Sequence, residues 1–153
     1  MKQHLRVAAI AALSFAFGLM VPHLPLAARA AAALTPEAVD LLAIAPDAMP
    51  TPTAMFPNLR TKTLVVTDGM TAALQMGTAP KHFHAGSNEV QIVLQGTGTE
   101  WLGDRRVDLR PGMFIVIPAG TAHAGLVDTS AGMLRFVSFK TPPQAPDDVH
   151  FMK

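Results

Sequence analysis

Residues 82–96 read HFHAGSNEVQIVLQG and set two histidines, a turn and a glutamate ahead of an apolar run. In an extended strand, side chains at positions i and i+2 point to the same side, so the two histidines share one face and the phenylalanine between them takes the other. Residues 85–88 carry the glycine, serine and asparagine of a turn, which places Glu89 at the start of the next strand. We therefore expect the imidazoles of His82 and His84 and the Glu89 carboxylate to face the same space.

A third histidine closes a second stretch, residues 112–123, which reads GMFIVIPAGTAH. His123 follows a turn signal at 118–120, where another strand pattern ends. Three imidazoles and one carboxylate suit a divalent ion such as Mn, Fe, Ni, Cu or Zn. The alternative of separate surface or core histidines is weak for this group, because buried imidazoles and a buried carboxylate need compensation. His150, near the C-terminus, is expected to be an ordinary surface residue.

Both stretches resemble the two motifs of the cupin superfamily. The first cupin motif is His-x-His, three or four residues, Glu, six residues and Gly, which residues 82–96 match. The second is Gly, five residues, Pro-x-Gly, two residues and His, which residues 112–123 match. Two positions depart from the pattern: Gly77 stands one residue closer to His82 than usual, and Val127 replaces an asparagine. The chain is thus similar to small, single-domain, metal-binding bacterial cupins of the cupin 2 conserved-barrel type.

The resemblance implies a binding site for one divalent transition-metal ion of open identity, with four ligands: His82, His84, Glu89 and His123. Glu89 is also the candidate catalytic group, since it is the only carboxylate expected at the centre. Alternation from Glu89 turns Gln91 inward, where it either contacts the substrate or holds a ligand in place, and both readings stay open. No lysine is expected beside the ligands, because Lys81 has the opposite phase to His82.

Short apolar or alternating runs recur between turn signals from residue 61 onward. They span residues 62–67, 70–76, 89–95, 98–102, 105–109, 113–117, 122–127 and 132–139. Several short strands with glycine-rich turns indicate an all-β sandwich or barrel, and the resemblance implies the jelly-roll, double-stranded β-helix barrel of the cupins. We expect this barrel over residues 61–141. The C-terminal tail, residues 142–153, is expected to leave the sheet because of its prolines.

Several side chains in these runs have an expected side. The apolar residues expected to pack inside the barrel are Phe114, Val116, Met133, Val137 and Phe139. Arg135 is expected to point outward into solvent, because a buried, unpaired charge is costly; the alternative is an inward Arg135 that binds a carboxylate substrate.

Residues 1–30 have the three-part order of a secretory signal peptide. Lys2 and Arg6 give a positive start, an apolar run follows over 7–21, and small residues at 28–30 offer a cleavage site. The run is short for a bilayer span, and an uncleaved anchor is the alternative. Cleavage would remove three basic residues and no acid, which changes the net charge from +1 to −2. We expect a periplasmic or secreted protein without a stable membrane anchor after cleavage.

Residues 31–60 predict a short helix followed by a proline-rich arm. Thr35 and Pro36 suit a helix start, so we expect a helix over residues 34–42. Four prolines between residues 46 and 57 exclude a central strand or a long helix. Residues 45–60 are therefore expected to lie extended on the domain surface or on a neighbouring subunit.

The composition excludes several classes of function. The 153 residues contain no cysteine and no tyrosine, which removes disulfides, thiolate metal sites and a phenolic base. The formal charge of +1 gives no basic field for a phosphate backbone, so no nucleic-acid partner is expected.

The resemblance favours a metal-dependent enzyme, most plausibly an oxygenase similar to the quercetin-dioxygenase-like small cupins, acting on a small oxygen-bearing organic molecule. The alternative is a non-catalytic module that binds a metal or a small ligand. An isomerase or lyase is less favoured, because such a reaction needs acid–base groups in addition to Glu89. The expected partners are a small-molecule ligand and a second copy of the chain, as a homodimer.

Overall fold

The computed structural model describes residues 34–127 and 133–152, all within one compact unit, Ala31–Lys153. Residues 1–30, for which a signal peptide is predicted, lie outside the described residues. No helix in the described ranges is long and apolar enough to cross a membrane.

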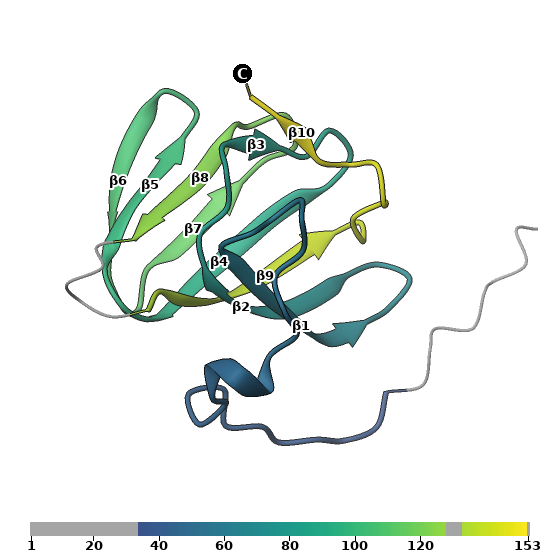
Figure 1. The fold of residues 1–153 in the computed structure, drawn as a ribbon. Coiled ribbons are helices and arrows are strands. Elements are labelled where there is room, and N and C mark those ends of the chain that lie inside the picture. The colour runs from purple at the N-terminus through teal and green to yellow at the C-terminus, as the bar shows by residue number, and fades with distance from the viewer. Residues whose placement is uncertain (1–33, 128–132, 153) are drawn as a thin grey trace, which may run out of the picture. The chain divides into compact units, whose positions relative to one another are not determined.

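The described residues form ten strands in two antiparallel sheets and one short 3-10 helix, η1 (Pro46–Ala48). One sheet has the order β1-β2-β9-β4-β7 and the other the order β10-β3-β8-β5-β6 (Figure 1). The prediction of an all-β, cupin-type jelly roll is confirmed. The strands are β1 (Leu59–Val66), β2 (Thr71–Gly77), β3 (His82–Phe83), β4 (Asn88–Gln95), β5 (Gly98–Leu102), β6 (Arg105–Leu109), β7 (Phe114–Ile117), β8 (His123–Val127), β9 (Arg135–Thr141) and β10 (His150–Phe151).

The main core fills the space between the two sheets. It is a cluster of buried aliphatic and aromatic residues from both sheets: Leu59, Val93, Leu109, Ile115, Ile117, Leu134 and Phe136. The expectation that Phe114, Val116 and Met133 pack inside is wrong, since these residues are 64%, 57% and 41% exposed. The four residues of β7 are all apolar, so no alternation of polar and apolar side chains indicates which face is buried. A one-residue change of phase moves every side chain to the other face.

The N-terminal segment covers the outer side of the first sheet. Met49 is buried with Leu74 and Met76 of β2, and Leu41 and Ile44 pack against this cluster. The extended arm therefore lies on its own domain, one of the two placements expected for it. Its contacts come from apolar side chains and from the Arg60 guanidinium, which donates to the carbonyl oxygens of Met49 and Pro50 at 3.4 and 3.3 Å.

The helix expected over residues 34–42 is absent from the described part of this segment, and the prediction was wrong. Asp40 Oδ1 accepts hydrogen bonds from the backbone N–H groups of Leu42 and Ala43, at 3.0 and 3.3 Å. Such local bonds offer the backbone an alternative to a helix. Val39 and Leu42 are exposed, so an amphipathic helix here would gain no packing.

Arg135 lies under the N-terminal segment. The expectation that its side chain is exposed to solvent is therefore wrong. Its guanidinium donates to the carbonyl oxygens of Leu41 and Leu42, at 3.4 and 2.9 Å. The side chain does point away from the space between the sheets. The covering segment, which supplies acceptors for the buried charge, was not foreseen.

The C-terminal tail leaves the first sheet after β9 and then joins the second sheet. Strand β10 pairs with β3, with His150 opposite Phe83 and Phe151 opposite His82. The backbone N–H of Met152 donates to the carbonyl of Lys81 at 2.9 Å. The tail is thus an edge strand beside the histidine-bearing segment.

Candidate metal centre

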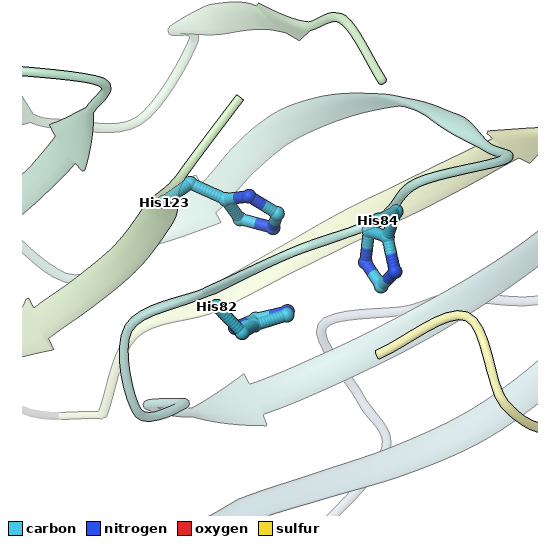
Figure 2. A group of neighbouring side chains, drawn as sticks. All are labelled: His82, His84 and His123. Carbon is cyan, nitrogen blue, oxygen red and sulfur yellow. The ribbon is translucent and has the colours of Figure 1, made fainter. Parts of the chain in front are cut away.

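Three histidines from two neighbouring strands of the second sheet meet at one point. His82 belongs to β3, His84 follows it directly, and His123 opens β8 as the register partner of His82. All three are buried, and their candidate ligand atoms lie within 4.8 Å of one another. Figure 2 shows the three imidazoles directed toward a shared space. The two histidine motifs, far apart in sequence, are therefore brought together as expected.

Each imidazole is oriented by a backbone carbonyl that contacts its Nδ1 atom. The acceptors are Pro80 for His82 (2.7 Å), Asp148 for His84 (2.9 Å) and Thr121 for His123 (3.0 Å). A carbonyl oxygen can only accept, so each Nδ1 carries a proton, and in a neutral ring the lone pair then lies on Nε2. Protein ligands of metal ions are commonly fixed in this way by a partner on the other ring nitrogen.

Glu89 approaches two of these three rings. Its Oε2 atom lies 3.2 Å from His84 Nε2 and 3.4 Å from His123 Nε2. The other oxygen, Oε1, accepts hydrogen bonds from Ser138 Oγ at 2.7 Å and Gln91 Nε2 at 3.0 Å. Two lone pairs facing a carboxylate oxygen repel one another unless a cation, either a shared proton or a metal ion, lies between them.

These converging atoms fit a metal ion. His84 Nε2, Glu89 Oε2 and His123 Nε2 are buried and have no hydrogen-bond partner among the described residues. Buried polar atoms without partners are rare and need an explanation, for which a bound ion is one. Imidazole and carboxylate ligands suit the divalent ions Mn, Fe, Ni, Cu and Zn. In this arrangement the three histidines and Glu89 would hold the ion.

The electrostatics prepare His82 and Glu89 in the forms that bind metals. At His123 burial lowers the pKa, but the contact with the Glu89 carboxylate outweighs burial and raises it, so a metal ion would have to displace a proton there. Burial, with the neighbouring His123, lowers the pKa of His82 to about 4, so this ring is neutral near pH 7. Burial opposes ionisation of Glu89, but its contacts with His123, His84 and Lys140 outweigh that effect and hold the pKa of the carboxyl well below its usual range. A neutral imidazole and an ionised carboxylate are the states that metal binding requires.

Lys140 also lies at the centre, where no lysine was expected. Its Nζ is 3.5 Å from Glu89 Oε2, and the side chain is largely buried. Strand β9 pairs with β4 and makes Lys140 the register partner of Glu89. The apolar run at 132–139 predicts a strand that stops one residue short of this lysine, and its pairing with β4 cannot be read from local sequence.

A cavity of about 240 Å³ opens beside the histidines between the two sheets. Apolar side chains such as Leu109 and Phe136 line it together with the hydroxyls of Thr61 and Thr63. Gln91 also lines it, is buried, and holds Glu89 through its amide. Its contact with a substrate stays a prediction.

A second carboxyl group, Glu100, lines the same cavity and was missed from the sequence. Its side chain is only 2% exposed, so the expectation of a single central carboxylate is wrong. Burial raises the pKa of Glu100 to about 7, with a further upward effect of Glu89 and opposing effects of His123 and Gln91. The only signal was a charged residue in mid-strand between Thr99 and Trp101, and alternation alone does not say which face is buried.

The fold and the site define a class: a cupin-type jelly roll with three buried histidines positioned to hold a metal ion. Residues 70–139 match the family model described as the Cupin domain. No curated protein sequence matches the chain. Residues 70–139 are thus similar to the Cupin domain, and the fold of the described residues is of the cupin type.

Several solved structures are similar in fold. The polyketide cyclase RemF from Streptomyces resistomycificus is 22% identical, with a TM-score of 0.59 over 78% of this chain and 87% of its own. KdgF from a Halomonas species is 19% identical, with a TM-score of 0.55 over 60% of this chain and 86% of its own. A cupin 2 conserved barrel domain protein from Rhodopseudomonas palustris is 16% identical, with a TM-score of 0.56 over 66% of this chain and 72% of its own. Similarity at these identities concerns the fold alone.

Proposed function

We propose that the protein is an exported, metal-dependent enzyme of the dioxygenase-like type, acting on a small oxygen-bearing organic molecule. The observation that carries the proposal is the convergence of His84 Nε2, Glu89 Oε2 and His123 Nε2 at the wall of a cavity. None of these atoms has a hydrogen-bond partner among the described residues. A cavity of about 240 Å³ is near the lower end of ligand pockets and suits a small molecule. The ligand would enter beside the histidines.

Different residues of the chain would have different roles in such a site. His82, His84, His123 and Glu89 would hold the ion, which when bound supplies Lewis-acid or redox chemistry. Ser138 and Gln91 fix the Glu89 carboxylate in place, and Lys140 balances its charge. The apolar cavity wall would exclude water from the bound molecule and strengthen every polar contact made to it.

A redox-neutral reaction, such as an isomerisation or elimination, is the second candidate. The observation that favours it is Glu100, a further acid–base group in the cavity of the kind that such chemistry needs. Lys140 adds a second titratable side chain. RemF, one of the structures similar in fold, is named a polyketide cyclase, so cupin-type barrels are not restricted to one reaction class.

Oxygen consumption separates the two candidates and also the non-catalytic alternative. Metal-loaded protein would be supplied with catechols, enols and dicarbonyl compounds in an oxygen electrode, with mass spectrometry of the products. The proposal expects oxygen uptake that depends on His123. A product formed without oxygen uptake would favour the redox-neutral reaction. Stabilisation by a ligand with no product in either assay would contradict catalysis and favour a binding module.

We propose export on the basis of the leader-like residues 1–30 alone. Expression of the full chain followed by fractionation and N-terminal sequencing tests it. A mature chain that begins near residue 31, found outside the cytoplasm, is the expected result. An intact N-terminus in the cytoplasmic fraction would contradict export without bearing on the metal site.

A further inference from the structure

We propose that Glu100 is the proton-transfer group of the cavity, exchanging a proton with a hydroxyl or enol oxygen of the molecule bound beside the histidines. This inference rests on the proposed function, because it assumes that a ligand occupies the cavity. It adds a catalytic residue from a strand that carries none of the candidate metal ligands. It also specifies the ligand class, which must carry an ionisable oxygen.

The position of Glu100 is set by the second sheet. Strand β5 lies between β6 and β8 and is paired with both, so the backbone on either side of Glu100 is held by two neighbours. The residue of β5 opposite His123 is Leu102, two positions along the strand from Glu100 and so on the same face. Glu100 therefore shares with His123 the face that borders the cavity.

One oxygen of the carboxyl group has no hydrogen-bond partner. Glu100 Oε2 is buried and lacks such a partner within the described residues, whereas the group as a whole interacts with the Gln91 amide. A buried carboxylate with an unsatisfied oxygen is costly. Two events remove that cost: protonation of the carboxyl, or a hydrogen bond from a bound molecule. A site that is costly when empty and satisfied when filled is typical of a functional position.

The groups that face Glu100 allow both protonation states near neutral pH. His123 from β8 and the Gln91 amide from β4 favour the carboxylate, whereas burial and the Glu89 charge favour the acid. Lys140 of β9 lies against Glu89 and is occupied there. Because Glu100 lines the cavity, is buried there and has an oxygen without a hydrogen-bond partner, the group is placed to accept a proton from a bound molecule and return it.

Glu89 is less suited to this role. Its two oxygens are engaged by Ser138, Gln91 and Lys140 and face the two histidines. A proton on Glu89 would disrupt those contacts. Glu100 can gain a proton without losing a hydrogen bond from its Oε2 atom.

The step balances as a simple proton transfer. The O–H bond of the ligand breaks, an O–H bond forms on Glu100 Oε2, and the electron pair of the broken bond stays on the ligand oxygen. The ligand becomes an oxyanion and Glu100 becomes a neutral carboxylic acid, so the net charge of the cavity does not change. No oxidant or reductant takes part.

Proton counting with zinc-loaded protein tests the proposal without turnover, since zinc is redox-inactive. Catechol is the probe, and calorimetry at pH 8 in buffers of different ionisation enthalpy gives the protons released on binding. The wild type is expected to release about one proton fewer than Glu100→Gln, because phenolic oxygens are protonated at this pH and Glu100 is not. The variant is expected to bind catechol roughly tenfold more weakly, the equivalent of one hydrogen bond to a charged group. Equal proton release and equal affinity would overturn the proposal.

A matched control and a second measurement keep the test decisive. Asp108→Asn removes an exposed carboxylate from the neighbouring strand β6 and should behave as the wild type. The chain has three glutamates, Glu37, Glu89 and Glu100, so side-chain carbon NMR can follow each. One carboxyl signal should titrate near pH 7 and be missing from Glu100→Gln. Titration of Glu100 near pH 4.5 would overturn the proposal even where catechol does not bind.

The same samples separate this inference from the proposed function. Zinc content reports the metal site independently of Glu100. A wild type that takes up no zinc contradicts the metal centre, whereas a zinc-loaded Glu100→Gln with unchanged proton release contradicts only the role of Glu100.

Discussion

His82, His84 and His123 carry their protons on Nδ1, and this single feature gives the centre its chemistry. Three backbone carbonyls fix that choice, at Pro80, Asp148 and Thr121. The Nε2 atoms of His84 and His123 face the Glu89 carboxylate. In the neutral form of the rings a cation between these atoms would be stabilising, so we expect ion binding and folding to be coupled at this point.

Replacing His82 with alanine should therefore reduce metal content and thermal stability together. In the wild type, zinc at about a thousand times its dissociation constant should add about 4 kcal/mol to the free energy of unfolding, and this gain should be lost in the variant. Zinc titration followed by calorimetry measures it. His150→Ala is the matched control, because His150 is exposed and only stacks on Phe83. A variant at His82 that keeps full zinc content would contradict the ligand assignment.

Glu100 predicts an unusual dependence of stability on pH in chelator-treated protein. Its pKa rises from an ordinary 4.5 to about 7 on folding, so the folded state holds the proton more tightly. Its contribution is thus present below pH 4.5 and is lost as pH rises to about 7 and above. Between pH 4.5 and pH 8 the wild type should lose roughly 3 kcal/mol of unfolding free energy relative to Glu100→Gln. Urea unfolding at several pH values would reveal it, and parallel curves for the two proteins would contradict it.

The sequence predicts at the residue scale only what lies within one motif. His82, His84 and Glu89 are separated by a single turn, and His123 follows a turn signal with a fixed offset, so local spacing brings them into one expected site. Lys140 and Glu100 reach the same cavity through strand pairing across the sheets. Such pairing depends on register, which local patterns do not specify.

At the scale of elements, the C-terminal tail is part of the candidate centre. Asp148 Oδ1 accepts a hydrogen bond from the backbone N–H of Gly86 at 2.6 Å, and its carbonyl accepts from His84. Burial opposes ionisation of this carboxyl, but hydrogen bonds from Gly86, Ser87 and Ala85 prevail and lower the pKa of Asp148. The tail thereby holds both the turn between β3 and β4 and one imidazole.

Asp148→Ala should weaken metal binding without removing any ligand. The substitution keeps the backbone carbonyl that orients His84 but removes the side chain that holds the turn at Gly86. We therefore expect a loss toward the low end of the about 10- to 100-fold in affinity that partners of metal ligands typically contribute. The missing acceptor for Gly86 should also cost about 1–3 kcal/mol of stability. Competition with a zinc chelator measures the first effect and thermal unfolding the second. Asp147→Ala, at an exposed neighbour, should leave both unchanged, and an unaltered zinc affinity in Asp148→Ala would refute the role of the tail.

Met49 of the N-terminal arm should stabilise the barrel without affecting the centre, whereas Phe56 of the same arm contacts His82. Met49 is buried against Leu74 and Met76, on the opposite side of the first sheet from the cavity. Met49→Ala should cost about 2–4 kcal/mol, the usual range for a buried methionine, with zinc content unchanged. Met55→Ala, at an exposed position of the same arm, is the control. No loss of stability in Met49→Ala would show that the arm does not pack as described.

Elements bounded by strong turn signals were predictable, and those that depend on tertiary contact were not. Strands β4, β5 and β6 fall within a residue or so of their expected ranges, because glycine-rich turns delimit them. The helix at 34–42 failed because an isolated amphipathic stripe needs a surface to pack against. Strand β10 is two residues long and exists only through its pairing with β3, so no local pattern indicates it.

At the scale of the whole molecule, the two sheets build a cavity with the candidate metal centre in its wall. One sheet supplies the three histidines and Glu100, and the other supplies Glu89 and Lys140. Neither sheet alone would assemble the site, so its integrity reports on the complete fold. The class of fold was predictable from spacing and turns, whereas the charge balance of the cavity needed both sheets in register.

We also propose a homodimer, on the resemblance alone. Light scattering of the purified protein should give about twice the chain mass, independent of added zinc. A monomer at all concentrations would contradict this proposal and leave the account of the cavity unchanged.

The measurement that tests the metal centre most directly is elemental analysis of protein purified from its native compartment, beside His123→Ala prepared in parallel. We predict about one transition-metal ion per chain in the wild type, since the site offers one set of converging ligands. The variant should retain little or none. A wild-type protein that carries no metal and takes up no zinc on titration, or a variant with the same content as the wild type, would contradict the account.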